Sequence, residues 1–234
     1  MPTWMILAKG PAFLFVLTLL SFGLLRLIFL TTWDIVAAIR RAGDQRLPYR
    51  QIALQTVYWL LPFNRLHRNR AGYCLASFSL HASLLIVSLF LRNHLDILQA
   101  NTGISWTSIS KPILDALTVI GILGASVLLV FRLYVTGSRR LSRTADYLLL
   151  LIILNIFASG YIAGRLWNPI PYDGLMLFHT VNGMVLLLVI PFSKIAHCVL
   201  FPLIRLGTEV AWHFVPLSGE QSVQTLHGPQ GRKI

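Results

Sequence analysis

Two histidines, His179 and His197, stand near the ends of one long apolar segment and are separated by 18 residues. A helix turns about 100° per residue, so on a continuous helix both imidazoles would point the same way after about five turns. At about 1.5 Å rise per residue they would lie roughly 27 Å apart, close to the thickness of a bilayer's hydrocarbon core, about 30 Å. Ionisable side chains inside a membrane need partners, so both histidines are functional candidates.

A second apolar segment carries His81 within it and His94 at its far end. If the two segments cross the membrane antiparallel, His81 shares the depth of His197, and His94 shares the depth of His179. Facing imidazoles on two helices suit bis-histidine haem b, and filling both axial positions favours electron transfer over oxygen chemistry. Two such haems at different depths would carry electrons across the membrane. The alternative is four ordinary helix-end histidines, hydrogen-bonded to backbone or to lipid headgroups.

His94 fits this scheme less simply than the other three histidines. It follows His81 by 13 residues, which turn about 220° on a straight helix and would aim the two rings almost oppositely. A local 3₁₀ or π distortion, or a haem approached from another side, must make up the difference. His67 precedes a polar stretch at residues 68–72 and is predicted to lie on the surface. His213 and His227 lie in the tail and receive no role.

The composition predicts the elements that must position these histidines. Only 12% of the residues are charged and 56% are hydrophobic, whereas soluble domains have about 25% charged residues. We therefore expect an all-α integral membrane protein, with a five-helix bundle over residues 1–205 and a cytoplasmic tail over residues 206–234. The apolar stretch Ile52–Leu66 is short and contains Pro62, so it is predicted to lie on the membrane surface. The five predicted spans are residues 12–33, 73–94, 112–134, 146–164 and 175–201.

The net charge of +12 comes from basic residues that cluster in short segments between the apolar runs. This pattern follows the positive-inside rule and does not indicate a nucleic-acid partner. The side that holds loop 34–72, loop 135–145 and the tail collects 15 Lys and Arg residues, against four on the other side. The asymmetry predicts an outside amino terminus and a cytoplasmic carboxy terminus, in the cytoplasmic membrane of a bacterium or archaeon.

Lys111 and Asp115 stand four residues apart at the outer end of the third predicted span. Sharing one helix face, they could bind a quinone oxygen and carry protons; the alternative is an ion pair that supports the helix N-terminus. Cys74 and Cys198 are isolated, with no CxxC motif, so neither an iron–sulfur cluster nor a zinc site is predicted. Five basic residues near the membrane edges could bind haem propionates, or could simply reflect topology: Arg92, Lys111, Arg132, Arg139 and Arg140.

The motif His179…Gly183…Pro191-Phe192-Ser193-Lys194…His197 resembles the last helix of the gamma subunit of respiratory nitrate reductase, a five-helix dihaem cytochrome b. The similarity covers roughly residues 65–205 and includes the helix of His81. The spacing from His81 to His94 is wider than in nitrate reductase. It is more similar to the related cytochrome b subunits of sulfate-reducer and heterodisulfide-reductase-like membrane complexes.

The resemblance implies two haems b, with axial pairs His81–His197 (inner) and His94–His179 (outer). It also implies quinol oxidation or quinone reduction beside the outer haem, with Lys111 corresponding to the family's quinone-site lysine. Electrons would then be exchanged with a cytoplasmic iron–sulfur or molybdenum redox subunit, docked on loop 34–72 and the tail. The chain would thus be the membrane subunit of a multisubunit oxidoreductase.

Two other functions remain open at this point. One is the haem-b membrane anchor of a hydrogenase or formate dehydrogenase, although the histidine arrangement of those proteins is not found here. The other is a haem-free membrane anchor or a transporter subunit. Against transport, the sequence has no internal repeat and no pair of broken helices.

Overall fold

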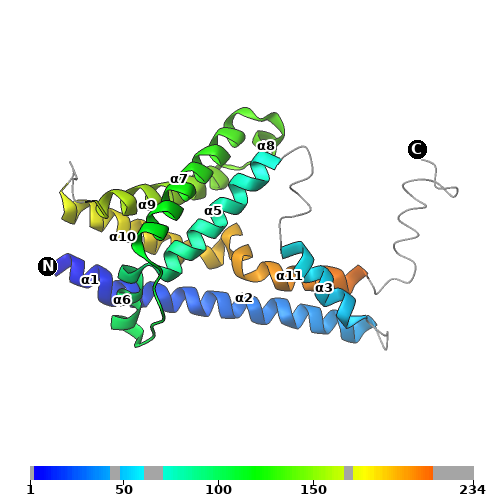
Figure 1. Cartoon of the computed structure of the whole chain (residues 1–234). Helices are drawn as coiled ribbons and strands as arrows, with labels where there is room; N and C mark the ends of the chain where they lie inside the picture. Colours follow the sequence, from blue (N-terminus) through cyan, green and yellow to red (C-terminus); the bar gives the residue numbers. More distant parts are fainter. Residues whose placement is uncertain (1–2, 43–47, 61–70, 166–170, 213–234) are drawn as a thin grey trace. The chain divides into compact units, whose positions relative to one another are not determined.

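The computed structural model describes residues 3–42, 48–60, 71–165 and 171–212, and over these ranges the chain is helical, with no β-strand (Figure 1). Within them, five helical stretches are long and apolar enough to cross a membrane. The expected all-α architecture, with five helices able to cross a membrane by their length and composition, is therefore confirmed for the described residues. These five stretches are Thr3–Arg40, Ala71–Phe90, Lys111–Tyr134, Thr144–Ala163 and Tyr172–Phe192.

The chain divides into two compact units, which are described separately. The first contains residues 1–20 and 62–190, and the second contains residues 21–61 and 191–234. The first unit holds α1 (Thr3–Leu7), the π-helical turn η1 (Ala8–Ala12), the start of α2 (Phe13–Ala42), α5 (Ala71–Phe90), α6 (Arg92–Thr102), α7 (Lys111–Tyr134), α8 (Thr136–Leu141), α9 (Thr144–Ala163) and α10 (Tyr172–Val189).

Helix α7 is central in the first unit, because it packs against both α5 and α9, while α10 packs against α9 (Figure 1). Two glycines of α7 allow this close approach. A Cβ at Gly124 would lie 3.0 Å from the backbone oxygen of Ala76, and one at Gly121 would lie 2.7 Å from the ring of Phe157. Small residues at helix contacts are typical of membrane bundles. The buried core is formed by Ala76, Leu80, Ala125, Leu128, Leu150 and Phe157.

Helix α5 ends at Phe90, so the single span predicted over residues 73–94 is interrupted. Leu91 is extended (φ −74°, ψ 125°) and α6 begins at Arg92, so part of the segment between the second and third predicted spans is helical. The following loop folds back and satisfies the carbonyls that the end of α5 leaves open. Trp106 Nε1 donates to the Leu89 carbonyl (2.9 Å), and Ile109 N donates to the Phe90 carbonyl (3.1 Å).

The predicted continuous helix over residues 175–201 is wrong. Helix α10 ends at Val189 and is followed by two 3₁₀ turns, η2 (Ile190–Phe192) and η3 (Lys194–Ala196), before α11 (His197–Trp212) begins. Pro191 has no N–H to continue an α-helix, and Ser193 between the two turns is extended (φ −132°, ψ 177°). The spacing of His179 and His197 predicted that they share one face of one helix. They do not, because His179 lies on α10 and His197 begins α11.

The second unit contains most of α2, together with α3 (Tyr49–Leu60), η2's Pro191 and Phe192, η3 and α11. Helix α3 packs against α11 around buried Ile52 and Val210. Of the surface segment predicted over residues 52–66, the part to Leu60 is helical and the rest lies outside the described residues. Helix α11 continues through Pro202 to Trp212, so the tail is helical further than expected.

Candidate functional site

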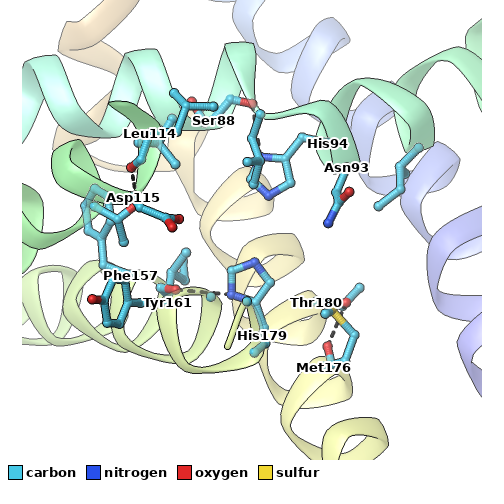
Figure 2. A pocket seen from close by; sticks show the side chains of 18 of the residues that line it. Ser88, Asn93, His94, Leu114, Asp115, Phe157, Tyr161, Met176, His179 and Thr180 are labelled. Carbon is cyan, nitrogen blue, oxygen red and sulfur yellow. Dashed lines mark hydrogen bonds between the residues drawn. The ribbon is translucent and has the colours of Figure 1, made fainter. Parts of the chain in front are cut away.

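His94 on α6 and His179 on α10 face each other in the first unit (Figure 2). Their ring centres are 6.2 Å apart and their planes differ by 15°. Nδ1 of His94 lies 3.2 Å from the Ser88 carbonyl oxygen. Nδ1 of His179 lies 3.1 Å from the Ile156 carbonyl oxygen and 3.1 Å from Ser159 Oγ. The other nitrogen of each ring is turned toward the opposite imidazole (Figure 2).

This arrangement fits a metal ion held between the two rings. Metal–nitrogen bonds are about 2 Å long, and a ring nitrogen is about 1.2 Å from the ring centre, so two imidazoles on opposite sides of one metal have centres roughly 6 Å apart. A hydrogen bond from Nδ1–H to a carbonyl fixes the tautomer in which Nε2 carries the free lone pair. Desolvation by the surrounding protein lowers the pKa of His94, which favours the neutral ring that coordinates metals.

The two histidines line a cavity of about 580 Å³ in the first unit. This volume lies within the range of roughly 300–1,000 Å³ typical of small-molecule and cofactor sites. Its walls are mostly apolar side chains from α5, α7, α9 and α10, with a few polar groups among them. The residues therefore fit a bis-imidazole haem better than a bare ion. The ionisable side chains and the amide that line the cavity besides the histidines are Lys9, Asn93, Asp96, Lys111, Asp115, Tyr161 and Tyr172.

The chain interruption at Leu91 explains how His94 reaches the cavity. On an unbroken helix, His94 would point about 220° around the axis from His81. The extended backbone of Leu91 ends α5 and starts α6 in a new direction. The expected 3₁₀ or π distortion is thus replaced by a break and a second helix.

Helix α9 holds the ring of His179. Ser159, 4% exposed, contacts its Nδ1, and a Cβ at Gly160 would lie only 2.8 Å from His179 Cε1. The ring therefore occupies space that any residue larger than glycine would take. Sequence reasoning missed Ser159; the only available signal was a small polar residue beside a glycine in an apolar helix.

Lys111 and Asp115, predicted as a tentative catalytic pair, line the same cavity as the two histidines. Lys111 Nζ lies 2.9 Å from Asp115 Oδ2, and Arg165 Nη2 lies 3.5 Å from the same oxygen. The Arg165 guanidinium also stacks over the Tyr161 ring, 4.1 Å from its centre. The Lys111–Asp115 ion pair predicted by the alternative interpretation is thus present. It lines the cavity, so a ligand bound there could contact it. Arg165 was not predicted as part of this site.

His81 and His197 show the same hydrogen-bonding pattern within their own units. Nδ1 of His81 lies 2.6 Å from the Ser77 carbonyl oxygen, and Nδ1 of His197 lies 2.5 Å from the Lys194 carbonyl oxygen. His81 belongs to the first unit and His197 to the second, so their pairing stays a prediction. Cys198 Sγ lies 3.9 Å from His197 Nε2, and this hydrogen bond raises the pKa of His197. His67, His213 and His227 lie outside the described residues.

Of the basic residues predicted near haem propionates, Lys111 lines the cavity. Arg92 pairs with Asp96 at 2.9 Å, and Arg132 donates to the Asp146 carbonyl at 2.5 Å. Arg139 and Arg140 are exposed on α8. For these four arginines, the contacts and exposure agree with the alternative interpretation, in which the basic residues only reflect membrane topology.

A protein of Nitratidesulfovibrio vulgaris Hildenborough is 33% identical to this chain over 172 residues, which cover 70% of this chain and 75% of that protein. The chain belongs to the family of that protein. Its name, simply "Protein", states no activity. No family model matches the chain. No solved structure matches it either. For this family, the arrangement of residues around His94 and His179 is therefore the main guide to function.

Proposed function

We propose that this chain is a membrane dihaem b-type cytochrome subunit that passes electrons between the quinone pool and a cytoplasmic iron–sulfur or molybdenum redox subunit. The observation that carries the proposal is the facing pair His94 and His179, with ring centres 6.2 Å apart. In each ring, a carbonyl oxygen near Nδ1 leaves Nε2 for coordination. His94 and His179 would hold the iron of one haem. A haem held by two protein ligands would supply one-electron transfer.

Beside this pair, Lys111 and Asp115 are suited to bind the quinone head group. Lys111 can donate a hydrogen bond to a quinone oxygen, and the Asp115 carboxylate can take a proton from a quinol hydroxyl. Arg165 Nη2, 3.5 Å from Asp115 Oδ2, places a second cation beside the same carboxylate. Oxidation of one quinol to quinone releases two protons and two electrons, so the proton-accepting group must return its proton to water between steps. Because Lys111 and Asp115 line the wall of the cavity that holds His94 and His179, a quinone bound by this pair would lie next to the haem.

The second haem would be held by His81 and His197, toward the side with most basic residues. This side is the cytoplasmic one in the proposed topology, with the amino terminus outside, in a bacterial or archaeal cytoplasmic membrane. The soluble redox partner would dock there, on the basic loop after α2 and on the carboxy-terminal segment. Reporter fusions at the carboxy terminus test the orientation: a cytoplasmic reporter should be active there, and an active periplasmic reporter would reverse it.

The deciding experiment is the haem content of the purified chain. We expect reduced b-type absorption bands and about two haems per chain in a pyridine haemochrome assay, one for each axial pair. A colourless protein, purified from cells that make haem, would refute the proposal and favour a haem-free membrane anchor.

A further inference from the structure

The amino-terminal helix is interrupted by a π-helical turn, η1, at Ala8–Ala12. Pro11 lies inside this turn and cannot donate the hydrogen bond that an α-helix requires at its position. Such π turns are rare and frequently occur at functional sites. The turn presents Lys9, which is half-buried and lines the cavity of His94 and His179.

The turn packs against both α6 and α10, the helices that carry these two histidines. It is tied to α6 by the Asn101 side chain, whose Nδ2 donates to the Lys9 carbonyl at 2.8 Å and to the Ile97 carbonyl at 2.8 Å. The backbone of the turn at Lys9 is therefore held against α6, and the Lys9 side chain starts from this fixed point at the cavity wall.

The acidic side chains that line the cavity already have basic partners other than Lys9. Asp96 pairs with Arg92, and Asp115 pairs with Lys111 and Arg165. None of the ion pairs found among the described residues includes Lys9. A partly desolvated ammonium group at a cavity wall is stabilised by an anionic partner. A ligand with a carboxylate would supply that partner.

We propose that Lys9 binds a propionate carboxylate of the haem held between His94 and His179. The inference rests on the proposed function, because haem is the ligand that brings both the iron for the imidazoles and a carboxylate for the ammonium group. A positive charge close to the haem also stabilises its reduced state, which carries one more electron. Lys9 is thus a binding residue that raises the reduction potential of this haem.

The test compares Lys9→Met, Lys9→Arg and Arg140→Met in the purified full-length chain. Arg140→Met is the matched control, because it removes one positive charge from an exposed side chain on α8 that does not line the cavity. Optical redox titration should show that Lys9→Met shifts the reduced-to-oxidised ratio of one haem about tenfold toward the oxidised form, equivalent to about 59 mV for one electron. Lys9→Arg should retain the wild-type potential, and Arg140→Met should change it much less than Lys9→Met does.

Reconstitution with haem dimethyl ester, which has no carboxylate charge, isolates the propionate contact when haem affinity is measured. With free haem, Lys9→Met should weaken the binding of one haem about tenfold, whereas with the ester the wild-type and Lys9→Met chains should bind alike. An equal loss of affinity with free haem and with the ester would overturn the inference, as would an unchanged potential with free haem. A wild-type chain that binds no haem would refute the proposed function itself, whereas a haem-loaded chain insensitive to Lys9 refutes only this inference.

Discussion

The imidazole of His94 lies nearly parallel to that of His179, with ring centres 6.2 Å apart across a cavity (Figure 2). The two residues are 85 positions apart in the chain. They meet because α6 leaves the axis of α5 at Leu91, and because Gly160 and Ser159 of α9 accommodate the ring of His179. Each imidazole is thus placed by groups outside its own helix.

Replacing His179 by alanine should remove one of the two haems. The substitution deletes a proposed ligand of the haem iron in the cavity beside Lys111 and Asp115, and it leaves His81 and His197 untouched. The pyridine haemochrome value should fall from about two to about one per chain, and reduction by quinol should be lost. His94→Ala should give the same result. Loss of both haems from either variant, or of neither, would contradict the pairing of His94 with His179.

Replacing Trp106 by phenylalanine should disturb the position of His94 without touching the cavity. The indole donates a hydrogen bond to the Leu89 carbonyl, next to the break at Leu91, and loss of such a bond costs about 1 kcal/mol. We expect the low-spin electron paramagnetic resonance signal of one haem to shift or broaden while haem content stays nearly unchanged. Trp33→Phe, at a 60% exposed tryptophan, is the matched control and should leave both signals intact. Identical spectra for Trp106→Phe and wild type would exclude this positioning role.

Long apolar runs made the five membrane stretches predictable, because a helix is the structure that satisfies its own backbone in lipid. The two interruptions of predicted helices, at Leu91 and after Val189, were harder to predict. Leu91 is as apolar as the two residues before it, and the end of α5 there is supported by hydrogen bonds from Trp106 and Ile109, 15 and 18 residues away. Pro191 did mark the second break, but a proline predicts a bend as readily as two 3₁₀ turns.

Most residues of the candidate site could be predicted from the sequence by their type, but their arrangement in space could be predicted only in part. Histidine is conspicuous in an apolar helix, so His94 and His179 could be named from the sequence, and Lys111 with Asp115 from their spacing. Arg165 and Lys9 could not be assigned, because only the packing of distant segments brings them to the cavity. The axial pairing of His81 with His197 remains a prediction.

Replacing Gly160 by alanine should displace the His179 ring. The added Cβ would lie 2.8 Å from His179 Cε1, and such overpacking typically costs about 1–3 kcal/mol. We expect weaker retention of one haem, measured as haem content after detergent washing or as a lower thermal midpoint for haem release. Gly183→Ala on α10 is a suitable control, because a Cβ there meets nothing within 4 Å and alanine favours the helix. If both variants behaved alike, the close fit of the ring against α9 would not matter for haem binding.

Replacing Asp115 by asparagine should separate quinol chemistry from haem binding. The change removes the carboxylate that pairs with Lys111 at 2.9 Å and with Arg165 at 3.5 Å, and with it the proposed acceptor for a quinol proton. Reduction of the haems by a quinol analogue should slow about a hundredfold, the lower end of the range for loss of a general base. Chemical reduction by dithionite and the haem content should stay unchanged, because neither involves Asp115.

The matched control for this substitution is Asp173→Asn. Asp173 lies in the exposed first turn of α10 and does not line the cavity, so the variant removes the same charge without touching the Lys111 pair. It should reduce with quinol at the wild-type rate. Equal slowing in both variants would show that net charge near the membrane edge matters, and wild-type rates in both would leave Asp115 as a structural ion-pair partner of Lys111 and Arg165. Slowing in Asp115→Asn alone would place the proton-accepting carboxylate beside His94 and His179.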